Sequence, residues 1–232
     1  MNKAAKILTL SAVALTLGAC SDIERSRDLG NPQVSGGTLA QQVCSICHGD
    51  VGSNVNGNSI NPTFPKLAGQ TKEYLVEEMT EFHLKDRKDP AAQAFMWGIA
   101  RNFTTKQMDE LAAYYSQQPV TPYAGHSNPA QVAAGQKIFN EGVLDKGVPA
   151  CMGCHGADAH GNGIIPRLAG QHADYIYKQL TVFNEDSTYS DKHPNATAEE
   201  LERPHEGPMT MVASGLTKAQ KHAVAAYLQT LR

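Results

Sequence analysis

Cys44-Ser45-Ile46-Cys47-His48 and Cys151-Met152-Gly153-Cys154-His155 are two copies of one five-residue pattern, and they decide the fold of this chain. Two residues between the cysteines place both sulfurs along one edge of a single helical turn. The pattern is typical of covalent haem attachment, in which the two thiols add to the vinyl groups of one porphyrin. The His that follows the second Cys then brings its imidazole under the ring and ligates the iron.

A single Cys-x-x-Cys is ambiguous, because zinc knuckles, redox dithiols and disulfides use the same spacing. Two copies with His in the same place favour haem. A four-Cys zinc site would leave both His residues and the repeat described below unexplained. Four of the five cysteines lie in the two patterns, and the fifth, Cys20, closes the N-terminal segment. We therefore predict two covalently attached haem c groups, one held by Cys44 and Cys47 and one by Cys151 and Cys154.

The N-terminal segment resembles a bacterial lipoprotein signal. Lys3 and Lys6 precede the apolar run 7–17, and Leu17-Gly18-Ala19-Cys20 has the form of a lipobox. An uncleaved transmembrane anchor is the weaker alternative, because a hydrocarbon core of ~30 Å needs about 20 apolar residues. Ordinary signal-peptidase cleavage just before Cys20 is the other. We predict a signal peptide at 1–19, lipidation at Cys20, and export to the periplasmic side of a bacterial membrane, inner or outer.

The rest of the chain is a tandem repeat. Pro65-Lys66-Leu67-Ala68-Gly69-Gln70 returns as Pro166-Arg167-Leu168-Ala169-Gly170-Gln171, at an offset of 101 residues. Further on, Ala112-Ala113-Tyr114 returns as Ala225-Ala226-Tyr227, at an offset of 113 residues. The change of offset indicates a 12-residue insertion in the second half, within residues 186–207. The two halves are therefore predicted to be one fold used twice.

Composition places the boundaries of the two predicted domains. The parts are a flexible tether at 20–35, a first domain at 36–119, a linker at 120–128 and a second domain at 129–232. Domains this small have limited cores, so a buried porphyrin would supply much of the missing apolar surface.

Helical signals recur in both halves. Each half offers a helix at the haem pattern, from about Thr38 and about Pro129, and a middle helix after the Pro-x-Leu-Ala-Gly-Gln turn. Each ends in a helix opened by Thr-x-x-Gln, at Thr104 and Thr217, which matches a capping box. No segment alternates as a strand does, so we predict an all-α protein.

A Met thioether is the expected sixth ligand of a low-spin electron-transfer haem, because it favours reduced iron. Among the seven Met residues, Met96 and Met209 stand in equivalent places, eight residues before the Thr that opens each final helix. We predict that a loop presents each sulfur to the iron, opposite His48 in the first domain and His155 in the second. The plain alternative is that both Met side chains only fill space in the core.

Other residues compete for the same role. Met211 is the second candidate in the second domain, and His205, four residues before Met209, is a third. The remaining His residues are predicted to be solvated or locally bonded: His83, His126, His160, His172, His193 and His222.

Charge excludes one class of partner. The formal net charge of −3 becomes −5 when Lys3 and Lys6 leave with the signal. Since no basic patch or stripe appears, nucleic acid is not a predicted partner. The negative charge permits steering toward a basic redox partner.

Taken together, these motifs over residues 36–232 resemble the dihaem cytochrome c4 family. The resemblance implies two class I cytochrome c domains related by a pseudo-twofold axis, with haem propionates facing each other. It also implies that the carbonyls of Pro65 and Pro166 accept the ring N–H of the proximal His, which tunes the iron ligand. Lys66 and Arg167 are the residues that would pair with propionates. The lipobox and the insertion depart from the family pattern.

The predicted function is electron transfer on the periplasmic side, with no small-molecule substrate. The donor would be a quinol-oxidising complex or a dehydrogenase, and the acceptor a terminal oxidase or reductase. The competing class is a haem enzyme, of the dihaem peroxidase or thiosulfate-oxidising type, which needs an iron with an open or exchangeable position. A third possibility is a cytochrome subunit fixed in a larger complex.

Overall fold

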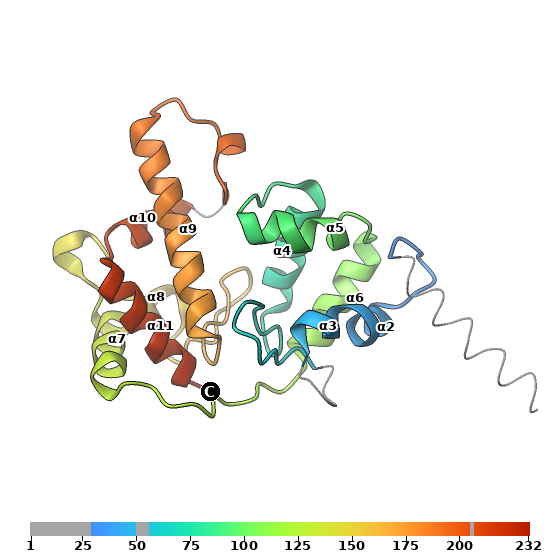
Figure 1. Cartoon of the computed structure of the whole chain (residues 1–232), viewed down its shortest axis with the longest axis horizontal. Coiled ribbons are helices and arrows are strands. Elements are labelled where there is room, and N and C mark those ends of the chain that lie inside the picture. The colour runs from blue at the N-terminus through green and yellow to red at the C-terminus, as the bar shows by residue number, and fades with distance from the viewer. Residues whose placement is uncertain (1–28, 50–55, 205–206) are drawn as a thin grey trace, which may run out of the picture.

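The computed structural model describes residues 29–49, 56–204 and 207–232. The predicted signal peptide, Cys20, most of the predicted tether and His205 lie outside these ranges. Figure 1 shows the chain as two groups of helices, the second half at the left of the view and the first half at the right.

Helices form nearly all of the regular structure in the described ranges. The first half contains α2 (Gly36–Leu39), the π-helix η1 (Ala40–Cys44), α3 (Ser45–His48), α4 (Lys72–Leu84), the π-helix η2 (Ala92–Met96), α5 (Trp97–Ala100) and α6 (Thr105–Ser116). The second contains α7 (Pro129–Glu141), the 3-10 helix η3 (Leu144–Lys146), α8 (Met152–His155), α9 (Ala173–Lys192), the 3-10 helix η4 (Ala198–Glu200), α10 (Gly207–Ser214) and α11 (Lys218–Thr230).

Extended pairing is limited, within these ranges, to the isolated bridges Val143–Val148 and Asn162–Ile165. The predicted all-α class is confirmed. No helix in the described part of the chain is both long and apolar enough to cross a bilayer.

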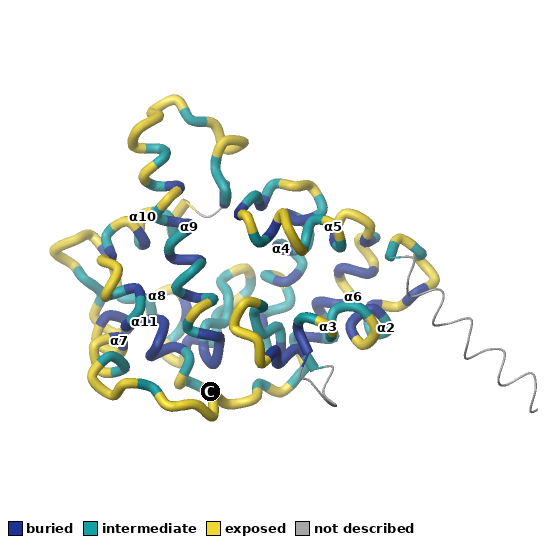
Figure 2. The backbone as a smooth tube through the Cα atoms, in the orientation of Figure 1, coloured by how far each residue is buried: buried dark blue, intermediate teal, exposed yellow. Residues whose placement is uncertain are grey.

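Each half has a hydrophobic core of its own. In the first, Leu39 of α2 and Leu111 of α6 are almost fully buried. In the second, Phe139 of α7 and Leu228 of α11 are almost fully buried. Burying a side chain of this size contributes about 1.5–3 kcal/mol. Figure 2 shows the buried residues concentrated on the inward faces of these helices, so the two halves pack as two domains.

Two glycines let helices cross at close range. A Cβ on Gly36 of α2 would lie 2.5 Å from Glu110 Cβ of α6. A Cβ on Gly135 of α7 would lie 2.0 Å from the carbonyl oxygen of Ala223 on α11. Each domain therefore brings its first and last helices into backbone contact, where only hydrogen fits at the crossing.

The final helix of each domain begins with the predicted capping box. Thr104 Oγ1 accepts from Gln107 N at 3.2 Å, and Gln107 Oε1 accepts from Thr104 N at 3.0 Å. At the start of α11 the corresponding distances between Thr217 and Gln220 are 3.3 and 2.9 Å. Both boxes are confirmed, and each satisfies two backbone N–H groups that a helix start leaves without an internal partner.

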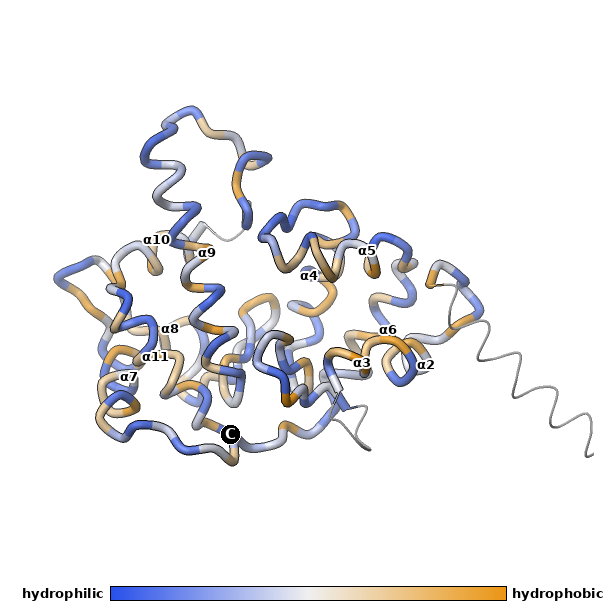
Figure 3. Tube along the Cα trace, in the orientation of Figure 1, coloured by the Kyte–Doolittle hydropathy of each residue, from blue (hydrophilic) through white to orange (hydrophobic). Residues whose placement is uncertain are grey.

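The insertion lengthens one helix and adds a segment that returns to the first domain. The middle helix α9 has 20 residues, whereas its counterpart α4 has 13. Residues 193–204, called the strap from here on, follow α9 and contain η4. Figure 1 shows α9 and the strap at the top of the view, and the outer end is exposed and hydrophilic (Figures 2 and 3).

Candidate functional site

The motif cysteines lie on short helical segments. Cys44 ends η1 and Cys47 lies in α3, while Cys151 precedes α8 and Cys154 lies within it. None of these four cysteines forms a disulfide. Both sulfurs of each pair can therefore attach to one porphyrin.

Thiol chemistry argues against the redox-dithiol interpretation. Burial raises the pKa of Cys44 to about 11, and burial raises the pKa of Cys151 to about 11. Reactive Cys-x-x-Cys pairs need the opposite, a lowered pKa that yields thiolate near neutral pH. In the described ranges, no group of three or more His, Cys, Asp or Glu side chains is placed to hold a metal ion.

His48 is held in one orientation by the turn that follows. It is buried at the end of α3, and its Nδ1–H donates to the carbonyl of Pro65 at 2.9 Å. Burial lowers the pKa of His48, against the opposing effect of the Pro65 hydrogen bond. The neutral ring therefore keeps its proton on Nδ1 and leaves the Nε2 lone pair for a metal.

His155 repeats this arrangement in the second domain. Its Nδ1–H donates to the carbonyl of Pro166 at 3.0 Å. Burial lowers the pKa of His155, again against the hydrogen bond to Pro166. The two imidazoles thus share one environment.

The backbone of the Pro-x-Leu-Ala-Gly-Gln turn explains why each Pro carbonyl stands where it does. In the first domain, Leu67 N donates to Gly57 O at 2.7 Å, and Gly69 N donates to Tyr115 O of α6 at 2.9 Å. In the second domain, the N–H of Leu168 donates to Ala159 O at 2.8 Å, and the N–H of Gly170 donates to Leu228 O of α11 at 2.9 Å. Each turn is therefore tied to its final helix.

Met96 and Met209 occupy matching places in the two domains. Met96 packs against the first core together with Cys44 and Leu67. Met209 packs against the second core together with Cys151 and Leu168, which are the repeat counterparts of those residues. In each domain the Met and the first haem-motif cysteine therefore pack against the same core.

Met96 and Met209 both lie in helices, so the prediction that a loop presents each sulfur is wrong. Met96 is the last residue of the π-helix η2, and Met209 lies in the first turn of α10. Single π-turns often occur at functional sites. Met211 is 68% exposed, in contrast to the partly buried Met209.

Several of the other His residues are held within their own domain, as predicted: His83 bonds Ala100 O at 3.1 Å, and His193 bonds Tyr189 O at 2.9 Å. The prediction is wrong for His172, which is buried and bonds Ser59 O of the first domain at 2.7 Å. His222 stacks on Tyr177 with ring centroids 3.8 Å apart.

Comparison with known proteins decides the family. The cytochrome c family model matches residues 33–118 and again 132–232. The chain is 34% identical to cytochrome c4 of Azotobacter vinelandii over 240 residues, which cover all of both chains. The solved cytochrome c4 of Acidithiobacillus ferrooxidans superimposes with a TM-score of 0.68 at 34% identity, over 81% of this chain and 98% of that chain. This chain belongs to the dihaem cytochrome c4 family.

Members of this family transfer electrons, and this chain carries two covalently attached haem c groups. The residues present fit that cofactor: each domain supplies two cysteines outside any disulfide, an imidazole whose Nδ1 is bonded and whose other nitrogen is available, and a thioether packed against the core that the first cysteine also contacts. A further relative, from Thiomonas intermedia, is named thiosulfate dehydrogenase electron acceptor. It is 33% identical over 189 residues, covering 80% of this chain and 76% of that protein.

The two cytochrome c domains meet through the same turns that orient the imidazoles. Gln70 Oε1 accepts from Arg167 N at 2.6 Å, and Gln70 Nε2 donates to Arg167 O at 3.0 Å. Gln171 Oε1 accepts from Lys66 N at 2.8 Å, and Gln171 Nε2 donates to Lys66 O at 2.9 Å. These reciprocal contacts are those of a pseudo-twofold interface.

Sequence reasoning did not assign a role to either glutamine, although both end the repeated turn. Their repetition at the same position of both turns is the signal that could have indicated a role. Lys66 and Arg167 are half-buried beside them, and burial lowers the pKa of each side chain. Lys66 Nζ donates to Thr121 O at 2.9 Å, and Arg167 Nε donates to Ala169 O at 3.1 Å.

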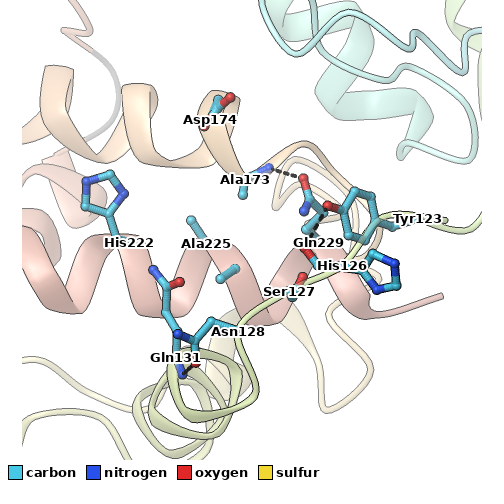
Figure 4. Close-up of a pocket in the computed structure, with 11 residues that line it drawn as sticks. Tyr123, His126, Ser127, Asn128, Gln131, Ala173, Asp174, His222, Ala225 and Gln229 are labelled. Atoms are coloured by element: carbon cyan, nitrogen blue, oxygen red, sulfur yellow. Dashed lines mark hydrogen bonds between the residues drawn. The ribbon is translucent and has the colours of Figure 1, made fainter.

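A cavity of about 220 Å³ lies away from the cysteines, lined by the linker, Gln131 of α7, the start of α9 and one face of α11. Figure 4 shows Tyr123 and His126 of the linker at one side of this cavity and His222 at the other, with a hydrogen bond of 2.9 Å from Ala173 N to Gln229 Oε1. None of the predicted haem-binding residues lines this cavity.

Proposed function

We propose that this protein is a lipid-anchored electron carrier on the periplasmic side of a bacterial membrane, with both irons closed by protein ligands. In the first domain Cys44 and Cys47 would hold the porphyrin, and His48 and Met96 would ligate the iron. In the second domain the corresponding residues are Cys151, Cys154, His155 and Met209. Bound haem supplies one-electron exchange between ferric and ferrous iron.

The observation that carries this proposal is the matched packing of Met96 and Met209. Each packs, partly buried, against the same hydrophobic core as the first cysteine of its haem motif and the Leu of the repeated turn. A thioether that ligates the iron in both domains would leave neither iron open to a substrate. The arrangement therefore favours conduction over catalysis at iron.

Pro65 and Pro166 act through the imidazoles. By accepting the Nδ1–H, each carbonyl fixes the ring plane and makes the coordinating nitrogen a better donor. Because both domains use the same bond, at 2.9 and 3.0 Å, differences between the two potentials must come from other parts of the domains.

Absorbance spectroscopy of the purified holoprotein tests the proposal. We expect two six-coordinate low-spin irons, a ferric Met–iron band from each, and slow cyanide binding at both. A high-spin fraction that binds cyanide rapidly contradicts the carrier and favours the enzyme alternative, of the peroxidase or thiosulfate-oxidising type.

The relative named thiosulfate dehydrogenase electron acceptor supports a dehydrogenase as the donor. We propose to test a thiosulfate-oxidising dehydrogenase first and a quinol-oxidising complex second, with a terminal oxidase or reductase as acceptor. Stopped-flow mixing of each reduced donor with the ferric protein gives the rate of reduction. A physiological donor is expected to reduce the ferric protein in a fast bimolecular phase. A slow phase with every donor contradicts the proposed donors and favours a cytochrome subunit fixed in a larger complex.

The lipid anchor is tested by Cys20→Ala in the full chain. The wild-type protein is expected in the membrane fraction and the variant in the periplasmic fraction, since the anchor supplies the membrane affinity. A variant that stays with the membrane contradicts lipidation at Cys20 while leaving the electron-carrier proposal intact.

A further inference from the structure

We propose that Arg203 is a positioning residue for the second haem. By bonding to Glu78 of the first domain it holds the strap, and so fixes the segment that presents Met209. The proposal rests on the proposed role of Met209 as an iron ligand. It gives a role to the insertion, which the repeat pattern of the sequence left unexplained.

Arg203 bridges two helices of different domains. Its Nη2 donates to Glu78 Oε1 of α4 at 2.5 Å, and its Nη1 donates to Gln179 Oε1 of α9 at 2.7 Å. Glu78 and Gln179 are equivalent residues of the repeat, at the offset of 101. Arg203 is 2% exposed and Glu78 is 6% exposed. The contact is therefore sealed from water at the centre of the interface.

Arg87 is the counterpart of Arg203 in the first domain. It donates to the same two side chains. Its guanidinium lies 4.8 Å from the ring centre of Phe82, as that of Arg203 lies 5.3 Å from the ring centre of Phe183. These two Phe residues are repeat equivalents. The arginines, however, are 116 residues apart, which neither repeat offset predicts, because the insertion supplies the second of them.

The charges around Glu78 make this contact difficult to open. Burial acts to raise the pKa of Glu78, but Arg203 and Arg87 outweigh burial and hold the pKa below its ordinary value. The carboxylate is therefore ionised and shared by two guanidinium groups. Arg87 Nε also donates to Asp89 Oδ2 at 2.7 Å. Removing one member leaves a buried charge without compensation.

Backbone contacts tie the strap to both domains at this point. Asp186 of α9 accepts from the backbone N–H of Glu202 and of Arg203, each at 2.8 Å. Across the interface, Lys88 N donates to Glu202 O at 2.8 Å. Arg203 precedes Met209 by only six residues, which span at most roughly 20 Å. Arg203 also lies over the ring of Phe183, which belongs to the buried core against which Met209 packs. A shift of Arg203 would therefore reach Met209 through that core.

The test uses Arg203→Lys, which keeps the charge but removes the planar fork. In a Met96→Ala background, the remaining ferric Met–iron band reports the second haem alone, and cyanide abolishes that band as it displaces the sulfur. We expect Arg203→Lys to speed cyanide binding at the second haem on the order of tenfold. The reason is that loss of a charge-assisted hydrogen bond makes local opening of the segment more frequent. In a Met209→Ala background, the rate at the first haem stays unchanged.

Glu78→Gln is a second test, because it places the change in the other domain. It is expected to speed cyanide binding at the second haem as well, through loss of the charge that holds Arg203. Glu199→Gln in the exposed part of the strap and Glu73→Gln on the exposed face of α4 are matched controls. Both are expected to keep the parental rates.

The outcomes separate this inference from the proposed function. If Met209→Ala leaves both Met–iron bands intact, the ligand assignment fails and the inference fails with it. If Met209→Ala removes one band but Arg203→Lys and Glu78→Gln match their controls, only the positioning role is overturned. If Arg203→Lys speeds cyanide binding at both haems, the protein is destabilised as a whole, and the positioning role of Arg203 is overturned.

Discussion

Gln70 and Gln171 make the same pair of hydrogen bonds in opposite directions across the domain interface. Each side chain bonds both the N–H and the C=O of one residue in the other domain, Arg167 for Gln70 and Lys66 for Gln171. Each glutamine also lies five residues after the Pro whose carbonyl accepts from the imidazole of its own domain. The interface and the two haem sites therefore share one backbone turn.

Replacement of either glutamine tests this coupling. Gln70→Ala leaves the backbone N–H of Arg167 without its partner in a part-buried interface, which costs about 1–3 kcal/mol. We expect a lower unfolding midpoint, measured by helical circular dichroism in urea, and a similar loss for Gln171→Ala. Gln136→Ala, on the exposed face of α7, is the control and is expected to stay within about 0.5 kcal/mol of the parent. A loss no larger than that of the control contradicts the role.

Local signals in the sequence predicted most of the haem environment. The Cys and His positions, the repeated turn and both capping boxes depend on residues within a few positions of one another. The beginning of α2 was two residues earlier than expected, because Ser35 Oγ accepts from Thr38 N at 3.2 Å and starts the helix there.

Contacts between distant residues escaped prediction. Arg87 and Arg203 meet at one carboxylate, but the insertion moves Arg203 out of the repeat register, so alignment of the two halves does not pair them. The helices that carry Met96 and Met209 were also missed. A π-helix such as η2 has no sequence period of its own, and α10 is a short helix stabilised by packing on α9 more than by propensity.

Each capping box is expected to stabilise the start of its own helix, α6 or α11. Thr104→Ala and Thr217→Ala each remove the acceptor for one backbone N–H, which costs about 0.5–2 kcal/mol. Urea unfolding followed by circular dichroism measures the loss. Thr105→Ala, at the exposed neighbouring position, keeps the cap and should leave the midpoint near that of the parent. Equal effects at positions 104 and 105 would argue that the box contributes nothing.

Gly135→Ala is expected to force α7 and α11 apart. The new Cβ would lie 2.0 Å from the carbonyl oxygen of Ala223, so the backbone must move, at a cost of about 1–3 kcal/mol or more. Differential scanning calorimetry of the holoprotein measures the change. Gly37→Ala is the matched helical control, because its Cβ would meet only Ser35 Oγ, at 3.9 Å. That control is expected to be neutral or stabilising by about 0.4–1 kcal/mol.

The two methionines near the second iron allow a matched comparison. Met209→Ala is expected to remove one ferric Met–iron band and to lower the potential of that haem, because a thioether favours reduced iron. Met211→Ala changes a side chain that is 68% exposed, and is expected to leave both bands and both potentials unchanged. Spectroelectrochemical titration measures both quantities. The reverse result, a lost band in Met211→Ala only, would exchange their assignments.

We expect Glu202 of the strap to make the stability of the folded protein depend on pH. Burial, followed by Asp186, Glu185 and Asp89, raises the pKa of Glu202 to about 7 from an ordinary value of 4.5. Between these two pH values the folded state keeps a proton that the unfolded chain releases, so this residue makes stability fall as pH rises from 4.5 through about 7. Thermal midpoints of the parent and of Glu202→Gln between pH 5 and pH 8 isolate the contribution, since glutamine does not titrate. The variant is expected to gain stability relative to the parent as pH rises, and parallel curves would show that Glu202 titrates normally.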